Sequence, residues 1–287
     1  MDRFLSAVGS SVGDMALYSF IALAWVVIYR ATKVLNFATG EFVVIGAFLA
    51  ADLMPNHELL SILASVVVLG TIGALTYVVL IRPFDGRPDW EPVIVSMGFA
   101  FVLDGVIAIA WGNSTASLAP PIAGTLGRLG FTPVTWLTLA AVLVVLLVVA
   151  LLLVFLNRSR TGIRLRAAAE APVLAEQSAI RLPSMFVIGW GASAALAALA
   201  GIYFAFSHNV IPSSTDLAIL GITPVLLGGL DSLVGAVVGS VITALALNIA
   251  SLYWGDSSQQ AVSGALVLLV LIIRPSGLFG SKRVARV

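Results

Sequence analysis

Apolar residues form long continuous blocks along the chain, separated by short polar stretches. The block from Leu137 to Leu156 is interrupted only by Thr138, and its length matches the roughly 20 residues that carry a helix across a bilayer. Because the blocks are continuous rather than alternating, they are not the strands of a transmembrane β-barrel. The pattern predicts a polytopic α-helical membrane protein, and the alternative is an unusually apolar soluble bundle.

Nine blocks are predicted to be membrane segments, at approximately Asp14–Tyr29, Phe37–Leu53, Leu59–Ile81, Pro92–Trp111, Val134–Leu156, Met185–Ser207, Leu217–Leu230, Val234–Trp254 and Gln260–Ile273. The seventh is short, which suits a re-entrant or broken helix, or a short span buried among others. The predicted fold class is therefore all-α, a polytopic transmembrane helical bundle with eight or nine membrane segments, one of them short or broken. We expect a single transmembrane domain over residues 1–287.

The loop after the fifth block, at about residues 157–184, is rich in arginine. Its charged residues are Arg158, Arg160, Arg164, Arg166 and Arg181 against Glu170 and Glu176. Cytoplasmic loops carry an excess of Lys and Arg, so this loop is predicted to be cytoplasmic. Alternating sides from there places the N-terminus outside and the basic tail after Arg274 inside. The tail is inside only if the short seventh block also crosses, which favours nine crossings over eight.

Composition supports a membrane protein and excludes several kinds of chemistry. The chain is 60% hydrophobic and 10% charged, with a mean hydropathy of +1.09, whereas soluble domains are about 25% charged. With a net charge of +1, the chain has no strong positive field that would attract nucleic acid. Without cysteine the chain forms no disulfide, thiolate nucleophile or Cys-ligated metal site. The first residues lack a basic region ahead of a short apolar one and are predicted to be the mature start, not a signal peptide.

No catalytic motif and no metal-ligand pattern is found in the sequence. P-loop, GxSxG and HExxH patterns do not occur, and His57 and His208 are predicted to be solvated residues of outer loops. Asp104, in the middle of the fourth block, is predicted to form an interhelical hydrogen bond to Ser, Thr or Asn. Asp231 is predicted to cap a helix that begins at Ser232. A role in proton coupling is the alternative for acidic residues at membrane depth.

The second block begins with an unusual polar stretch that contains Asn36, Thr39, Gly40 and Glu41. One interpretation is local: Asn36 caps a helix that restarts here, and the Glu41 carboxylate lies near the positive end of that helix. The other is functional, because irregular backbone at membrane depth is tolerated where it lines a cavity. Its amides and carboxylate would then bind a polar solute or hold a gate closed. The residues alone leave both interpretations open.

The arginine-rich loop is predicted to form a helix, a break and a second helix. Leu165–Glu170 favours a helix, Pro172 suits the first turn of the next one, and Val173–Ile180 continues it toward Pro183. Such a helix pair, with arginines and exposed Glu170 and Glu176, suits the docking of another protein. The alternative is an amphipathic loop that rests on lipid headgroups.

Small residues recur at helical spacing in two places. Gly235 and Gly239 form a GxxxG pattern, and a second stripe consists of Ala194, Ala197, Ala198 and Gly201. Small residues let membrane helices approach closely. We expect packing within the chain, with a contact between subunits as the alternative.

Five blocks in this order resemble the LivH-type permease subunits of ABC importers, the branched-chain amino-acid transport family. They are VLNFATGEFVVIGAFLA (34–50), RTGIRLRAAAEAPVLAEQSAI (160–180), MFVIGWGASAALAALAGIYF (185–204), LLGGLDSLVGAVVGSVITALA (226–246) and LIIRPSGLFG (271–280). Thr39 stands where the family typically has His, Leu220 where it often has Lys, and Asp231 where Gly is usual. Ala179 replaces a Gly of the coupling loop. The polar departures concern the solute more than the fold.

The resemblance implies a division of labour among subunits in the cell (inner or plasma) membrane. The partners would be a second permease (LivM-like or homologous), two ATP-binding subunits (LivG/LivF-like), an extracytoplasmic solute-binding protein and membrane lipid, with no nucleic acid and no cofactor. The coupling residues would be Arg164, Arg166, Glu170, Pro172, Glu176 and Ile180. The path or gate would comprise Asn36, Thr39, Gly40, Glu41, Ser96, Gly98, Gly228 and Gly229.

Branched-chain or other hydrophobic amino acids are the solutes that this resemblance implies, with urea, short amides or another small solute as alternatives. A stand-alone secondary transporter or channel is the rival of a different class, and it would show coupling-ion sites or inverted repeats. An intramembrane enzyme is a further rival, for which Asp104 and Asp231 are the candidate carboxylate pair. The resemblance itself implies a transport subunit without catalytic residues.

Overall fold

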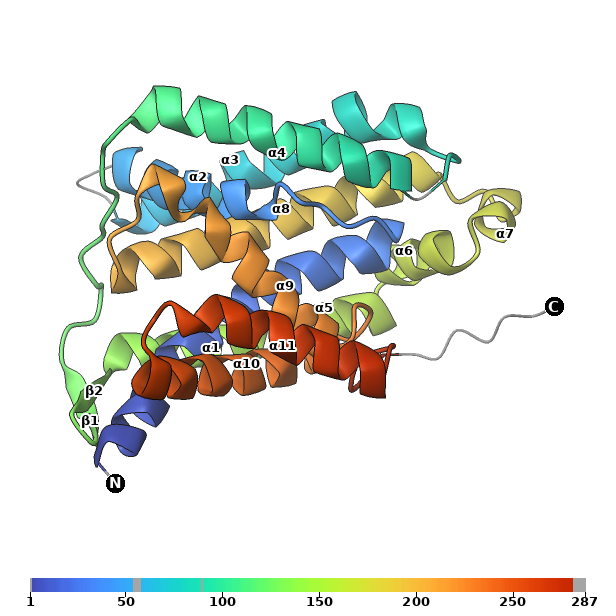
Figure 1. Cartoon of the computed structure of the whole chain (residues 1–287). Coiled ribbons are helices and arrows are strands. Elements are labelled where there is room, and N and C mark those ends of the chain that lie inside the picture. Colours follow the sequence, from blue (N-terminus) through green and yellow to red (C-terminus); the bar gives the residue numbers. More distant parts are fainter. Residues whose placement is uncertain (1, 54–57, 89, 281–287) are drawn as a thin grey trace. The chain divides into compact units, whose positions relative to one another are not determined.

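The computed structural model describes residues 2–53, 58–88 and 90–280, with the side chains of residues 58 and 215–220 left aside. The described part is almost entirely helical (Figure 1). Its α-helices are α1 (Asp2–Thr32), α2 (Thr39–Asp52), α3 (Glu58–Thr76), α4 (Trp90–Trp111), α5 (Trp136–Arg158), α6 (Arg160–Glu170), α7 (Pro172–Gln177), α8 (Leu182–Ser207), α9 (Leu217–Gly228), α10 (Leu233–Trp254) and α11 (Ser258–Ile273). The predicted all-α class is confirmed.

Three short helical turns and one hairpin complete the described elements. A π-helical turn, η1 (Tyr77–Ile81), and a 3-10 turn, η2 (Arg82–Phe84), extend α3, while η3 (Pro212–Asp216) precedes α9. The hairpin consists of the antiparallel strands β1 (Thr125–Leu129) and β2 (Thr132–Thr135).

Each of the nine predicted blocks forms a helix, but their lengths differ. Within the described residues, six helices are long and apolar enough to cross a bilayer: Asp2–Thr32, Leu59–Phe84, Trp90–Trp111, Trp136–Arg158, Leu182–Ser207 and Leu233–Trp254. The other three, α2, α9 and α11, have 14, 12 and 16 residues, fewer than the roughly 20 of a full span. The polytopic character is therefore confirmed, and the choice between eight and nine crossings stays a prediction.

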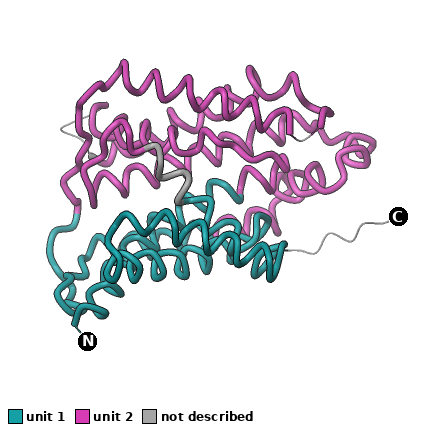
Figure 2. Tube along the Cα trace, in the orientation of Figure 1, with its two compact units in different colours: residues 1–26, 122–149, 219–287 teal, residues 27–121, 150–218 magenta. Residues whose placement is uncertain are grey.

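The chain divides into two compact units (Figure 2). The first contains residues 1–26, 122–149 and 219–287, and the second contains residues 27–121 and 150–218. Each unit is built from segments that are distant in the sequence.

In the second unit, α8 packs closely along both α2 and α3. A Cβ on Gly46 of α2 would lie 2.6 Å from the Ala198 Cα, and one on Gly201 would overlap the Val43 carbonyl oxygen. On α3, a Cβ on Gly73 would overlap Ala194. The stripe of small residues on α8 is thus buried against neighbouring helices, which confirms the prediction that it packs within the chain.

In the first unit, the GxxxG pattern of α10 lies against α9. A Cβ on Gly235 would overlap the Gly228 carbonyl group, and one on Gly239 would overlap the carbonyl oxygen of Pro224. The Thr223 and Ser263 hydroxyl groups, 2.5 Å apart, join α9 to α11. Asn248 of α10 donates to the Asp14 carboxylate of α1 at 2.7 Å. Here too the small residues serve packing within the chain.

The cap at the start of α10 differs from the prediction. Ser232, not Asp231, is the N-cap residue, and its hydroxyl accepts a hydrogen bond from the Gly235 N–H at 2.9 Å. The helix therefore begins at Leu233, one residue later than expected. The predicted capping role of Asp231 is wrong because a serine immediately after it has the extended backbone that an N-cap requires.

The stretch between α4 and α5, predicted to be a loop, contains the hairpin. Gly130, at φ 63°, forms its turn, where glycine avoids the strain that other residues meet. The Phe131 N–H donates to the Ser6 hydroxyl at 2.7 Å, and the Thr132 hydroxyl donates to the Ser6 carbonyl at 3.0 Å. The hairpin thereby covers the first turns of α1.

Candidate functional site

The chain breaks between α1 and α2, at the polar stretch that the sequence singled out. Lys33 has a φ of 60°, which ends α1. Asn36 is buried, and its side-chain oxygen accepts from the Ala38 N–H at 3.1 Å, while its carbonyl accepts from the Thr39 hydroxyl at 2.7 Å. The N-cap position belongs to Ala38. The predicted cap at Asn36 is therefore wrong by two residues, because its amide folds into a turn ahead of the helix.

Ser96 of α4 brings a second helix to this break. Its hydroxyl accepts from the Phe37 N–H at 3.2 Å and donates to the Val93 carbonyl of its own helix at 2.7 Å. Asn36, Thr39, Gly40, Glu41 and Ser96 are all buried here, and we call these five residues the α2 break cluster.

The remaining predicted path residues lie elsewhere. Gly98 is exposed on α4, and a Cβ there would meet nothing within 4 Å. Gly228 and Gly229 belong to the other compact unit. Gly229, at φ 110°, turns the chain after α9 and approaches Gly280 so closely that a Cβ would lie 2.6 Å from the Gly280 nitrogen. The predicted helix break at these two glycines is confirmed, since α9 ends at Gly228.

Glu41 occupies the first turn of α2, as predicted, but the helix end satisfies its carboxylate only in part. The side chain is 8% exposed, and its Oε2 atom finds no hydrogen-bond partner among the described residues. The Nδ2 atom of Asn36 also has no hydrogen-bond partner among the described residues. Most buried polar atoms in native structures are hydrogen-bonded, so each exception calls for an explanation.

Asp104 of α4 is the second acidic residue of this region. It lies on the same helix as Ser96. Asp104 is exposed, and no hydrogen bond joins it to Ser, Thr or Asn within the described ranges. The predicted interhelical hydrogen bond is not found among the described residues and stays a prediction.

Glu41→Gln is expected to slow solute uptake at least tenfold while the subunit still assembles in the membrane. The amide keeps the size of the side chain but removes the charge, and hydrogen bonds to charged groups contribute about 1.5–3 kcal/mol, roughly 10- to 100-fold. Uptake per assembled complex is the measurement. Glu91→Gln is the matched control, because Glu91 forms an ion pair with Arg87 at 3.3 Å and lies outside the α2 break cluster. Loss of the subunit from the membrane would instead favour the helix-end interpretation.

The arginine-rich loop forms α6 and α7, which confirms the predicted helix, break and helix. Ser159 caps α6 by accepting from the Gly162 N–H at 2.9 Å, and Pro172 occupies the first turn of α7. Helix α7 ends at Gln177 rather than at Ile180, because Ala179 adopts a left-handed φ of 58°. The Ile180 N–H then donates back to the Ala175 carbonyl at 3.0 Å, as in a Schellman motif.

Most of the predicted coupling residues lie on the surface of this helix pair. Arg164, Glu170, Pro172 and Glu176 are exposed. Ile180 is half-buried, and so is Arg166, whose guanidinium donates to the Asn157 side chain at 3.2 Å. Arg166 thus ties α6 to the end of α5 rather than pointing freely outward.

Three exposed apolar side chains on the same surface were missed by the sequence analysis. Val173 and Leu174 of α7 are 68% and 64% exposed, and Ile163 of α6 is 47% exposed. Only Ala175 of the six residues of α7 is buried, so the helix offers its larger apolar residues to a partner. The signal was present in the sequence as two aliphatic residues directly after Pro172, in a stretch predicted to leave the membrane.

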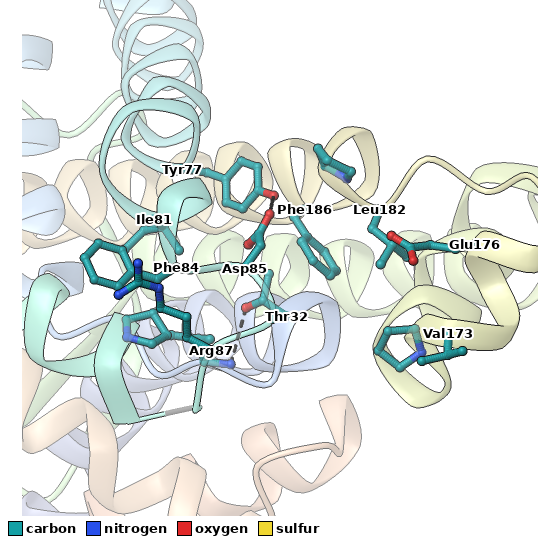
Figure 3. A pocket seen from close by; sticks show the side chains of 15 residues that line it. Thr32, Tyr77, Ile81, Phe84, Asp85, Arg87, Val173, Glu176, Leu182 and Phe186 are labelled. Atoms are coloured by element: carbon teal, nitrogen blue, oxygen red, sulfur yellow. Dashed lines mark hydrogen bonds between the residues drawn. The ribbon is translucent and has the colours of Figure 1, made fainter.

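A cavity of about 500 Å³ lies beside α7 (Figure 3). Glu176 and Val173 line it from α7, and Tyr77 and Asp85 line it from the turns after α3. The Tyr77 hydroxyl donates to the Asp85 carboxylate at 2.5 Å, and burial raises the pKa of Asp85. This link was not predicted, because the two residues fall on either side of an expected helix end.

In the sequence, the two histidines and the basic tail lie apart from the α2 break cluster and from α6 and α7. His208 directly follows α8, is exposed and contacts the Phe204 ring, with ring centroids 5.1 Å apart. His57 and the basic tail residues lie outside the described residues, as does the side chain of Leu220. No group of three or more His, Cys, Asp or Glu that could hold a metal ion is found among the described residues.

Comparison with known proteins decides the family. The model of the branched-chain amino acid transport system permease component matches residues 8–273. The chain belongs to this permease family. The resemblance to LivH-type permeases is thereby confirmed, and the chain is a multi-pass membrane protein of a transport family.

Relatives of this permease come from bacteria and from an archaeon. The chain is 27% identical to the high-affinity branched-chain amino acid transport system permease protein BraD of Pseudomonas aeruginosa, over 97% of this chain and 96% of BraD. It is 26% identical to the corresponding LivH protein of Escherichia coli, over 99% and 98% of the two chains. It is 27% identical to a probable LivH protein of Methanocaldococcus jannaschii, over 92% and 89%. All three are named as transport permeases rather than enzymes.

Proposed function

We propose that this permease forms part of the solute path of a binding-protein-dependent ABC importer for branched-chain or other hydrophobic amino acids. The family match over residues 8–273 carries the proposal. The chain matches its relatives over nearly their whole length, and these relatives are named as branched-chain amino acid permeases. Their names support the solute class. The extent of the match, residues 8–273, supports the expectation that the whole chain acts as one permease domain.

The proposed partners follow the division of labour in such importers. A second permease, LivM-like or otherwise homologous, completes the path, and a solute-binding protein delivers solute from outside. Two ATP-binding subunits, LivG/LivF-like, hydrolyse ATP and dock on α6 and α7 from the cytoplasm. The N-terminus then lies outside and the C-terminus inside the inner or plasma membrane. The exposed apolar and charged residues of α6 and α7 support this docking site.

The α2 break cluster, together with Gly98, Gly228 and Gly229, is proposed to belong to the path or its gate. The unsatisfied Oε2 of Glu41 and Nδ2 of Asn36 support this role, because they offer an acceptor and a donor without first breaking a protein hydrogen bond. The permease supplies no chemistry of its own. It supplies two packings of similar free energy, and nucleotide binding to the ATPase subunits shifts the balance between them.

Reconstitution of the permease with its ATPases, second permease and binding protein tests the proposal. In proteoliposomes, we expect uptake of labelled leucine that requires ATP and is inhibited by valine and isoleucine but not by urea or acetamide. Inhibition by urea alone would overturn the solute class. Uptake that persists without the ATPase subunits would overturn the importer and favour a secondary transporter or channel.

A further inference from the structure

Helix α4 buries only one narrow stripe in its own compact unit. Its buried residues are Pro92, Ser96, Ala100, Leu103 and Ile107, which recur every three or four residues and so lie on one face. The opposite face is exposed: Phe101 is 77% exposed, Val102 60% and Ile109 88%. Such a face on a membrane helix meets either lipid or another membrane protein.

The position of Asp104 indicates that the exposed face of α4 does not contact lipid. Asp104 lies beside the buried stripe but is itself exposed. It is seven residues from Trp111, the nearer end of α4, or about 10 Å along the helix axis. When a helix of this length spans a bilayer about 30 Å thick, a residue at that distance from its end lies in the hydrocarbon region. A carboxylate at that depth is energetically costly when lipid surrounds it. Acidic residues at membrane depth therefore usually face protein or a water-filled path.

Helix α5 provides the contrast within the same chain. It is equally long and exposed, with Leu143, Leu146, Leu147, Leu151 and Val154 on its surface. No ionisable residue occurs between Trp136 and Asn157. The exposed face of α5 is suited to lipid, and the exposed face of α4 is not.

Two glycines on the exposed face of α4 leave room for close approach. Added Cβ atoms on Gly98 and Gly105 would meet nothing within 4 Å. The two glycines are seven residues apart, or about two helical turns, so they lie nearly one above the other. Small residues in such positions allow the backbone of another membrane helix to come close, and the exposed Phe101 and Ile109 side chains supply apolar contact area beside them.

We propose that the exposed face of α4, centred on Phe101 and Gly105, contacts the second permease of the importer, a chain of the same family. Asp104 then lines the path between the two permeases. The proposal rests on the proposed function, since only an importer of this kind has a second permease. This face lies in the apolar span from Trp90 to Trp111, which is predicted to be inside the membrane. A water-soluble protein could not reach it there.

Photo-crosslinking from position 101 tests the contact in the assembled complex. The photoreactive residue benzoylphenylalanine replaces Phe101, a conservative exchange because the ring is already exposed, and the membranes that hold the complete importer are irradiated. We expect an adduct with the combined mass of two permeases, whose peptides come from this chain and from a permease of the same family. The matched control carries the photoreactive residue at Leu151 of α5, 58% exposed, and is expected to yield no adduct with a permease.

Two results would overturn the contact. One is the absence of a protein adduct from position 101, as for a face that meets lipid. The other is an adduct confined to the same chain or formed with an ATPase or binding protein. Leucine uptake by the unmodified complex is measured in the same membranes. Failure of uptake counts against the proposed function, whereas normal uptake without the adduct counts against this interface alone.

The place of Asp104 in the path is tested separately. Asp104→Asn is expected to leave the crosslink from position 101 intact and to slow leucine uptake at least about tenfold, as for the loss of one charged hydrogen bond. Normal uptake in this variant would overturn the role of Asp104 in the path.

Discussion

Gly201→Ala is expected to destabilise the permease by at least about 1–3 kcal/mol, the usual cost of inserting a methyl group into a packed interior. A Cβ at this position would overlap the carbonyl oxygen of Val43 and lie 2.9 Å from the Ala47 nitrogen. Both obstacles are backbone atoms of α2, so no side-chain rotation relieves the overlap. Helices α2 and α8 must move apart, and the contacts along their interface weaken together.

The fraction of monodisperse protein after detergent extraction, followed as a function of temperature, measures this effect. Gly264→Ala in α11 is the matched control, since a Cβ there would meet nothing within 4 Å. That variant is expected to be as stable as the wild type or slightly more stable, because alanine favours a helix over glycine by up to about 1 kcal/mol. Equal thermal stability of the two variants would contradict the close packing of α2 and α8.

The helices could be predicted from the sequence because bilayer thickness imposes a length on apolar runs. The block 137–156, for example, lies entirely inside α5. The break between α6 and α7 was equally accessible, since Pro172 lacks the N–H that a continuing helix needs. These features depend on residues close together in the sequence, where composition and spacing decide the outcome.

Features that depend on competition between neighbouring groups were predicted less well. Asn36 and Asp231 are both good capping residues, yet Ala38 and Ser232 occupy the N-cap positions. One or two residues decide where a helix starts, and the backbone path settles that choice. The hairpin at Thr125–Thr135 was not predicted, because its strands are short and Pro133 weakens the strand signal.

The candidate site required contacts between distant segments. The sequence picked out the α2 break cluster and the exposed charges of α6 and α7, because polar residues stand out against apolar blocks. It could not place Ser96 at the Phe37 N–H, since this contact joins α4 to a segment some 60 residues away. Gly98 was grouped with this cluster, yet it lies on the exposed side of α4.

Replacing Val173 and Leu174 by serine is expected to release the ATPase subunits from the permease. The two side chains are 68% and 64% exposed, so their loss leaves the fold of α7 intact. If docking buries both, their removal costs about 3 kcal/mol, or roughly 100-fold in affinity. The ATPase chains should then separate from the permease during size-exclusion chromatography, and solute-stimulated ATP hydrolysis should disappear.

The control for this variant comes from the predicted outer side of the membrane. Leu126 of β1 is 50% exposed, and Leu126→Ser removes a similar amount of apolar surface where no ATPase reaches. It is expected to retain both ATPase chains at wild-type stoichiometry. If the α7 double variant also retains them and couples ATP hydrolysis normally, the docking surface lies elsewhere. The exposed aliphatic residues after Pro172 would then need another explanation, of which contact with lipid headgroups is the one that the neighbouring arginines favour.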